Sequence, residues 1–275
     1  MAVTNFLSTI WSKMIIANLD RQSVVGDICN RNYEGDASNN AVVKVPSIVK
    51  PTISPYTRNS SVLVYEDIDG STQDLNIDQS HSFSFYLDDC DKAQMGVPDL
   101  QAATASAALG MVDVIDQYVL NFHKYAGIQY GDIAINSSNV NEVLAHCARL
   151  LDEENNADGG RWLVAPPWLV EKMRLAKIVS GTDNSAVLEN GIIGNYLGFS
   201  IRKSTNVDCD STDDMVLFGL NNAISLVIQI NSVEAIRLEG SFSDAVRGLL
   251  LFGSKVIVPL SLGCLHCSEI AEAGV

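Results

Sequence analysis

The chain has 275 residues, of which 47% are hydrophobic and 19% charged. This composition is typical of a protein with a sizeable core, and it excludes global disorder. The formal net charge is −15, and no run of Lys and Arg offers the cation clusters that bind phosphates, so a nucleic-acid-binding role is not expected.

The cysteines and the apolar runs indicate the compartment. Six cysteines spread along the chain are too sparse for a disulfide framework. The first residues lack the charged and apolar regions of a signal peptide, and no apolar run reaches the roughly 18 residues of a membrane span. We expect a soluble, thiol-containing protein that folds in the cytoplasm and does not enter a membrane.

The first predicted element is an amphipathic helix over residues 4–20. A helix this short is marginally stable in isolation, so its apolar face must dock on other protein. Docking on its own core and docking on a neighbouring subunit both remain open. The large side chains on that face include Phe6, Ile10, Trp11 and Met14.

Residues 41–90 are predicted to form β structure with little support of its own. Pro46, Pro51 and Pro55 cannot donate to a sheet ladder and restrict the first run to an edge strand or a loop. Asp69-Gly70 is a hairpin-turn signal. If the next run is extended over 73–87, it spans about 50 Å. A hairpin of this length must fold back on the core or reach another chain.

The longest predicted element is a helix over residues 99–126, about 40 Å in length. Asp99 is a suitable N-cap, apolar residues recur at helical spacing, and Gly127 is expected to end the helix in a left-handed conformation. We expect the apolar stripe to pack beneath terminal strands that include Val256 to Val258. Asp113 and Asp116 are expected to face solvent or an interface.

The remaining chain predicts a mixed block of helices and strands over 136–231, followed by long terminal strands. A helix starts after Asn139, RWLVA from Arg161 is a buried strand, and Pro167 suits the first position of a further helix. The fold class predicted from the sequence is therefore α+β.

The clearest chemical motif is Cys264-Leu-His-Cys267. It supplies two sulfur ligands where a structural zinc site needs four, so packing cysteines are the favoured interpretation and a small thiol or metal enzyme is the alternative. The acidic run from Glu66 to Asp74 lacks the ligand spacing of a calcium loop. No phosphate-binding or nucleophile-elbow motif occurs. We predict no catalytic, cofactor-binding or metal-binding residue.

The order of these pieces resembles the major capsid protein of tailed bacteriophages, which has the Hong Kong 97-type fold. An arm helix, a long hairpin, a long helix, an α/β block and a return of long strands follow one another along nearly the whole chain. The resemblance lies in the stretches NRNYEG (30–35), FSFYLDDCDKAQ (83–94), RWLVAPPWL (161–169), YLGFSIRKSTNV (196–207) and FSDAVRGLLLFGSKVIVP (242–259).

This resemblance implies four parts of the subunit. They are an N-terminal arm at 1–40, an extended β-hairpin loop at 41–90, a peripheral domain at 91–135 and 232–275 with a spine helix over 99–126, and an axial domain at 136–231. It also implies a non-enzymatic, cofactor-free coat protein that assembles into pentamers and hexamers of an icosahedral head around double-stranded DNA.

The resemblance further implies partners and a location. The chain would contact itself, a separate scaffolding protein, a portal and decoration proteins. It would fold in the host cytoplasm, become part of the virion capsid and enclose DNA without reading its sequence. An encapsulin-like shell around protein cargo is the alternative within this fold. The residues expected at subunit interfaces are Phe6, Ile10, Trp11, Met14, Pro51, Pro55, Tyr56, Arg58, Asp69 and Gly70.

Overall fold

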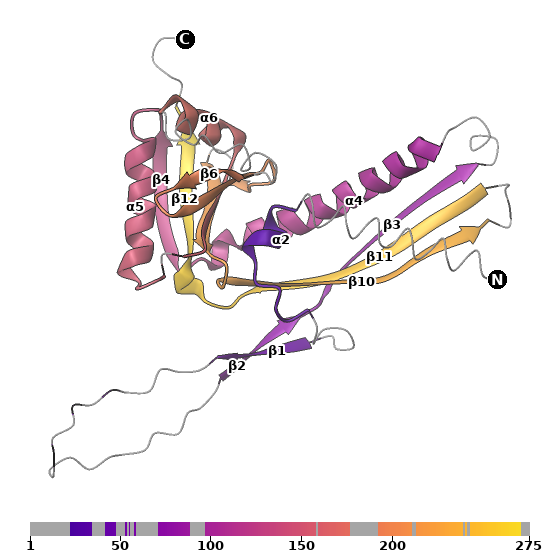
Figure 1. Ribbon diagram of the computed structural model, residues 1–275, viewed down its shortest axis with the longest axis horizontal. Coiled ribbons are helices and arrows are strands. Elements are labelled where there is room, and N and C mark those ends of the chain that lie inside the picture. Colours follow the sequence, from indigo (N-terminus) through magenta and orange to yellow (C-terminus); the bar gives the residue numbers. More distant parts are fainter. Residues whose placement is uncertain are drawn as a thin grey trace.

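The computed structural model describes residues 23–34, 42–47, 53, 55, 58, 71–88, 97–157, 159–176, 192–210, 213–238, 240 and 243–270. These residues form a compact block and an elongated body that extends from it (Figure 1). Helices and three sheets are mixed along the chain. The predicted α+β class is confirmed.

The compact block is built on a seven-stranded mixed sheet. Its strand order is β4-β12-β9-β5-β7-β6, with β8 paired to β9. Two pairs are parallel (β12 with β4 and β5 with β7), and the other pairs are antiparallel. The strands are β4 (Ile128–Ile135), β5 (Arg161–Ala165), β6 (Ile192–Tyr196), β7 (Phe199–Lys203), β8 (Cys209–Asp210), β9 (Asp213–Leu220) and β12 (Leu262–Glu269).

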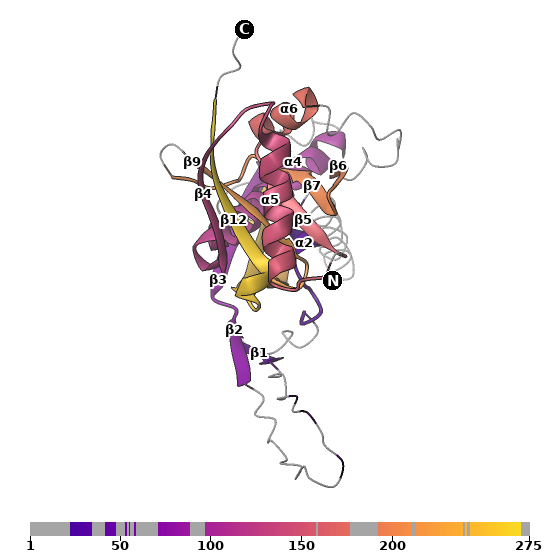
Figure 2. The ribbon, with the colours of Figure 1, turned by 90° about the vertical axis from the view of Figure 1, so that its left-hand side faces the viewer.

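Both faces of this sheet are buried at its centre. Trp162 and Val164 of β5 point to one face, and Leu163 and Ala165 point to the other, as the period of two along a strand requires. Helices α5 (Val140–Glu153) and α6 (Pro167–Leu175) cover the second face. Seen from the side of the block, α5 crosses in front of the strands (Figure 2).

The elongated body is a long antiparallel sheet with a helix along one face. Its strand order is β10-β11-β3, with β10 at Ile224–Arg237, β11 at Ser243–Val256 and β3 at Gln79–Asp88. Helix α4 runs beside these strands (Figure 1). Leu250 and Phe252 of β11 pack against it, and the Phe252 ring meets Tyr118 edge to face at 5.3 Å.

Helix α4 spans Val97–Leu120 and continues as the short 3-10 helix η2 over Asn121–Tyr125. The long helix is present, although it begins two residues earlier than expected. The expectation for Gly127 was wrong, because positive-φ glycines in the described chain are Gly160 and Gly198. A Cβ at residue 127 would lie 2.7 Å from the Pro259 carbonyl oxygen. Close backbone approach therefore favours glycine there.

The run over 73–87 is not one strand. Strand β2 (Ser71–Asn76) pairs with β1 (Val42–Ser47) in a two-stranded sheet, whereas β3 joins the long sheet. The two short strands lie below the long sheet (Figure 1). As predicted from Pro46, β1 is an edge strand.

Strand β4 forms one edge of the seven-stranded sheet within the described chain. Its pairing with β12 shifts register, so Gly131 and Asp132 together oppose one residue of β12. Asp132 has a φ of 56°, in the left-handed region that Asp tolerates better than most residues. This β-bulge interrupts the regular ladder at the sheet edge.

Candidate assembly surfaces

The block and the elongated body meet at a corner formed by the 3-10 helix η4 (Pro259–Ser261). The Gly127 amide donates to the Pro259 carbonyl oxygen at 2.9 Å, and the Ile257 amide donates to that of Ala223 at 2.8 Å. The chain passes between the two bodies near Gly127, near Ala223 and between Ile257 and Pro259. The two hydrogen bonds link these three passages to one another. The corner therefore fixes how one body is directed from the other.

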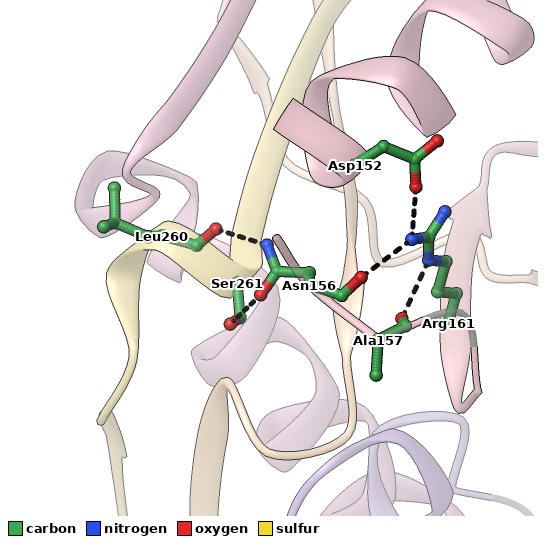
Figure 3. Close-up of polar contacts among 6 residues, drawn as sticks. All are labelled: Asp152, Asn156, Ala157, Arg161, Leu260 and Ser261. Atoms are coloured by element: carbon green, nitrogen blue, oxygen red, sulfur yellow. Dashed lines mark hydrogen bonds and ion pairs between the residues drawn. The ribbon is translucent and has the colours of Figure 1, made fainter. Parts of the chain in front are cut away.

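A polar cluster extends this corner to the loop after α5 (Figure 3). The Asn156 amide nitrogen donates to the Leu260 carbonyl oxygen at 2.9 Å, and the Ser261 hydroxyl donates to the Asn156 side-chain oxygen at 2.6 Å. Arg161 is 4% exposed, and its guanidinium donates to Asp152 at 2.5 Å and to the Asn156 and Ala157 carbonyls. The cluster satisfies a buried cation while it holds η4 in place.

Asp116 corrects a sequence expectation. Its side chain does not face solvent, since the residue is 2% exposed. Its carboxylate accepts hydrogen bonds from the Ser23 hydroxyl at 3.0 Å and from the Val24 and Val25 amides at 3.3 Å. Burial raises its pKa to about 6, although these three donors favour the charged form. Asp113 is exposed as expected and accepts a hydrogen bond from Asn206.

The base of the segment over 48–70 is fixed to the long sheet. Val43, Val45 and Leu75 form an apolar cluster with Val227 of β10. The Lys255 ammonium donates to the Asp74 carbonyl oxygen at 2.8 Å. The backbone of β11 also approaches the link between β2 and β3 closely, because a Cβ at residue 253 would lie 2.2 Å from the Asn76 carbonyl oxygen.

Two of the predicted interface residues are described, and both Pro55 and Arg58 are exposed. Neighbouring Ile53 is 95% exposed. The other predicted interface residues lie outside the described part of the chain, so their role stays a prediction. They are Phe6, Ile10, Trp11, Met14, Pro51, Tyr56, Asp69 and Gly70.

The face of the long sheet opposite α4 is open in the described chain. Tyr86 on this face is 72% exposed. Arg247 and Glu234 form an exposed ion pair across the strands at 2.7 Å. Beside them is an open hollow of about 360 Å³ lined by residues of all three strands. Such a face can contact another protein without unfolding any part of this chain.

A second hollow, of about 380 Å³, lies where α4 and η2 meet the end of β11. Its lining includes the aromatic residues Tyr118, Phe122 and Tyr125, and Tyr125 is 65% exposed. Pro259 also lines this hollow, and its two neighbours in the sequence, Val258 and Leu260, are exposed large apolar residues. Exposed apolar residues gathered in this way are typical of interaction surfaces.

Cys264 and Cys267 are both fully buried on β12 and point to opposite faces of the sheet. Cys264 belongs to the core beneath α4, and Cys267 belongs to the core beneath α5 and α6. Burial raises the pKa of the Cys264 thiol to about 12 and raises that of Cys267 as well. The two thiols therefore cannot coordinate the same metal ion. Within the described chain, no three His, Cys, Asp or Glu side chains gather as a metal site.

No family model and no curated protein sequence matches the chain. Solved structures do match. A chain of Mycobacterium phage Che8 is 28% identical, with a TM-score of 0.72, over 89% of this chain and 91% of that one. The capsid of Cyanophage P-SCSP1u matches at 15% identity and a TM-score of 0.69, over 91% of this chain and 89% of that one.

A virus-like particle from Pyrococcus furiosus also matches, at 12% identity and a TM-score of 0.59, over 94% of this chain and 99% of that one. These likenesses define the class of fold as that of a viral shell subunit. Within that class, the chain has the Hong Kong 97-type fold of the major capsid proteins of tailed phages, as its sequence predicted.

The sequence did not indicate the long-range polar contacts at the corner or around Asp116. Asn156 and Ser261 are 105 positions apart, and Ser23 and Asp116 are 93 apart. A single sequence carries no signal for such pairs. Among the described residues, no helix is long and apolar enough to span a bilayer.

Proposed function

We propose that this chain is the major capsid protein of a phage head. The likeness to the Mycobacterium phage Che8 chain, over about nine-tenths of both chains, is the observation that carries this proposal. The open faces of the elongated body support it, because a shell subunit needs surfaces that neighbouring copies cover. Many such contacts can each be weak and still hold a closed shell together.

In this function the chain divides into the parts named above. The arm at 1–40 and the extended loop at 41–90 reach neighbouring copies. The peripheral domain comprises 91–135 and 232–275, and α4 is its spine. The axial domain at 136–231 contributes to contacts around the axes of pentamers and hexamers. The apolar cluster that fixes β1 and β2 to Val227 supports a defined starting direction for the loop.

The proposed partners are other copies of the chain, a separate scaffolding protein, a portal and decoration proteins. The shell encloses double-stranded DNA, and the net charge of −15 suits a wall that does not bind DNA tightly. The subunit folds in the host cytoplasm and ends in the virion. It acts as a structural protein without an enzymatic step.

Electron microscopy of the purified protein tests this function. We expect closed particles of uniform size, formed by the chain alone or with its scaffolding protein supplied. A well-folded monomer or dimer at high concentration, with the scaffolding protein present, would contradict the proposal.

The arm offers a point-variant test of assembly. Trp11→Ala should lower particle yield while circular dichroism of the subunit stays unchanged. Ser12→Ala, which alters a neighbour outside the apolar face, is the matched control. An unfolded Trp11→Ala subunit would show that the arm belongs to the intramolecular core.

A shell around protein cargo is the second candidate, because a virus-like particle from Pyrococcus furiosus shares the fold, and the fold by itself does not specify what a shell contains. The lower identity and TM-score of that match favour the phage head. The contents of purified particles separate the two candidates. Nuclease-protected DNA supports the phage head, and a packaged protein in place of DNA supports the cargo shell.

A further inference from the structure

Asp116 lies where the first described residues of the chain meet α4. The short helix α2 (Val25–Ile28) begins there, and residues 1–22 precede it in the sequence. The carboxylate of Asp116 faces three donors: the Ser23 hydroxyl and the Val24 and Val25 amides. All three donors lie at the point where residues 1–22 join the described chain.

The contacts beyond α2 hold a different part of this segment. The Asn30 amide donates to the Ile224 carbonyl oxygen at 2.8 Å, and the Leu226 amide donates to that of Asn30 at 3.0 Å. Asp27 pairs with Arg202 of β7 at 2.8 Å. Val25 and Ile28 are buried. Residues 25–30 are therefore held by several elements, whereas the hydrogen bonds that join Ser23 and Val24 to α4 converge on one carboxylate. The Ser23 hydroxyl also accepts from the Gly26 amide at 2.9 Å, a bond within the same segment.

The chemistry of this contact requires an acceptor. An ionised carboxylate can accept from all three donors at once. An amide at the same position brings an NH₂ group that cannot accept, so at least one backbone N–H loses a good partner. An unsatisfied buried donor costs more than the bond itself contributes.

We propose that Asp116 is a positioning residue, and that its carboxylate fixes the direction in which residues 1–22 leave the body of the subunit. Asp116 is not needed to hold α4 in place, because the apolar stripe of α4 packs against the long sheet without it. Loss of the carboxylate releases Ser23 and Val24 from α4, although the Gly26 amide still donates to the Ser23 hydroxyl, while α2, α4 and β10 stay folded. The consequence for assembly rests on the proposed function: without the carboxylate, the arm would be presented to neighbouring copies in the wrong direction.

Hydrogen exchange on the full-length, unassembled chain tests this inference. In Asp116→Asn at pH 7.5, the protection factors of the Val24 and Val25 amides should fall about tenfold, the equivalent of about one net hydrogen bond. Trypsin should also cleave after Arg21 faster than in the wild type. Asp113→Asn is the matched control, because Asp113 is exposed on the same helix and accepts from Asn206.

A pH series separates positioning from simple loss of packing. Asp113 is the charged neighbour on α4, and the Cys29 thiol, which has the Arg31 cation near it, is the titratable neighbour that follows α2. Because the pKa of Asp116 lies at about 6, its carboxylate is neutral at pH 5 in the wild type. The difference in protection between wild type and Asp116→Asn should therefore shrink toward none at pH 5.

Three outcomes would overturn the inference. They are unchanged protection of Val24 and Val25 in Asp116→Asn, an equal loss of protection throughout α4 and β10, and a difference that persists at pH 5. If Asp116→Asn does not fold, Ser23→Ala removes one of the three donors to the carboxylate, together with the acceptor of the Gly26 amide, and must lower protection at the Val24 and Val25 amides by a smaller factor. No shell is needed for these measurements, so failure of the anchor and failure of the proposed function are distinguishable.

Discussion

The compact block and the elongated body of this subunit solve the problem of burial in different ways. In the block, helices cover one face of the central strands and the core beneath α4 covers the other, so every residue of β5 is buried. In the elongated body, α4 covers one face of a three-stranded sheet, while Tyr86 and Arg247 are exposed on the other. The block is complete within one chain, whereas the elongated body presents surface that a neighbouring copy can cover.

The largest expected effect tests whether the block is stable by itself. Phe218 is fully buried on β9, meets Phe199 edge to face at 6.2 Å, and lies against the backbone of Gly263. Phe218→Ala should lower the free energy of unfolding by about 3–5 kcal/mol, because it leaves a cavity that the rigid sheet cannot close. Urea denaturation of the unassembled subunit measures this loss. A loss below about 1 kcal/mol would mean that the block is far more plastic than its packing indicates.

The next effect concerns the carboxylate of Asp116, on helix α4 of the elongated body. Its pKa rises from 3.8 in the unfolded chain to about 6 in the folded one. The folded state then binds more protons across that window, so this group's contribution to stability falls as pH rises from about 4 to about 6, by about 3 kcal/mol. Above pH 6 its contribution is constant.

Asp116→Asn should flatten this part of the pH profile, and Asp113→Asn should leave it unchanged. Unfolding free energies measured at intervals between pH 4 and 7 give the comparison. A wild-type profile without the fall, or an equal slope in Asp116→Asn, would contradict the assignment.

A smaller effect is expected where the β1–β2 sheet rests on the elongated body. A Cβ at residue 253 would lie 2.2 Å from the Asn76 carbonyl oxygen and 2.9 Å from the Ile77 Cα. Gly253→Ala should therefore cost about 1–3 kcal/mol, the range of overpacked sites. Protease sensitivity of the 48–70 segment and thermal unfolding would both report it.

Gly240→Ala is the matched control for this substitution, since nothing lies within 4 Å of a Cβ placed there. It should leave thermal unfolding nearly unchanged. Equal effects of the two substitutions would show that the close approach at Gly253 carries no energy.

The smallest effect is a gain in stability. Gly110 is exposed in α4 and has nothing within 4 Å of an added Cβ. Gly110→Ala should raise the free energy of unfolding by about 0.5–1 kcal/mol, because alanine loses less backbone entropy in a helix. Thermal denaturation measures the gain. A decrease would indicate that α4 needs flexibility at this turn.

The sequence predicted those features that local pattern determines. The spacing from Met111 to Tyr118 indicated the helix, and the apolar run in RWLVA indicated a buried strand. Asp116 was misread because its exposure depends on Ser23, which is 93 residues away. Gly127 was misread because a distant carbonyl, and not the local helix end, requires a glycine. The split between β2 and β3 follows from two different partner strands, which a single run of alternating residues does not name.

The bulge at Gly131 and Asp132 has a consequence for a protein that must reach high local concentration. An unbroken edge such as β4 would invite the strands of other copies to add to the sheet, which is a common route to aggregation. The extra residue and the left-handed Asp132 disrupt the ladder at that edge. Copies of this chain can therefore lie close together at this edge without β4 adding to the sheet of a neighbouring copy.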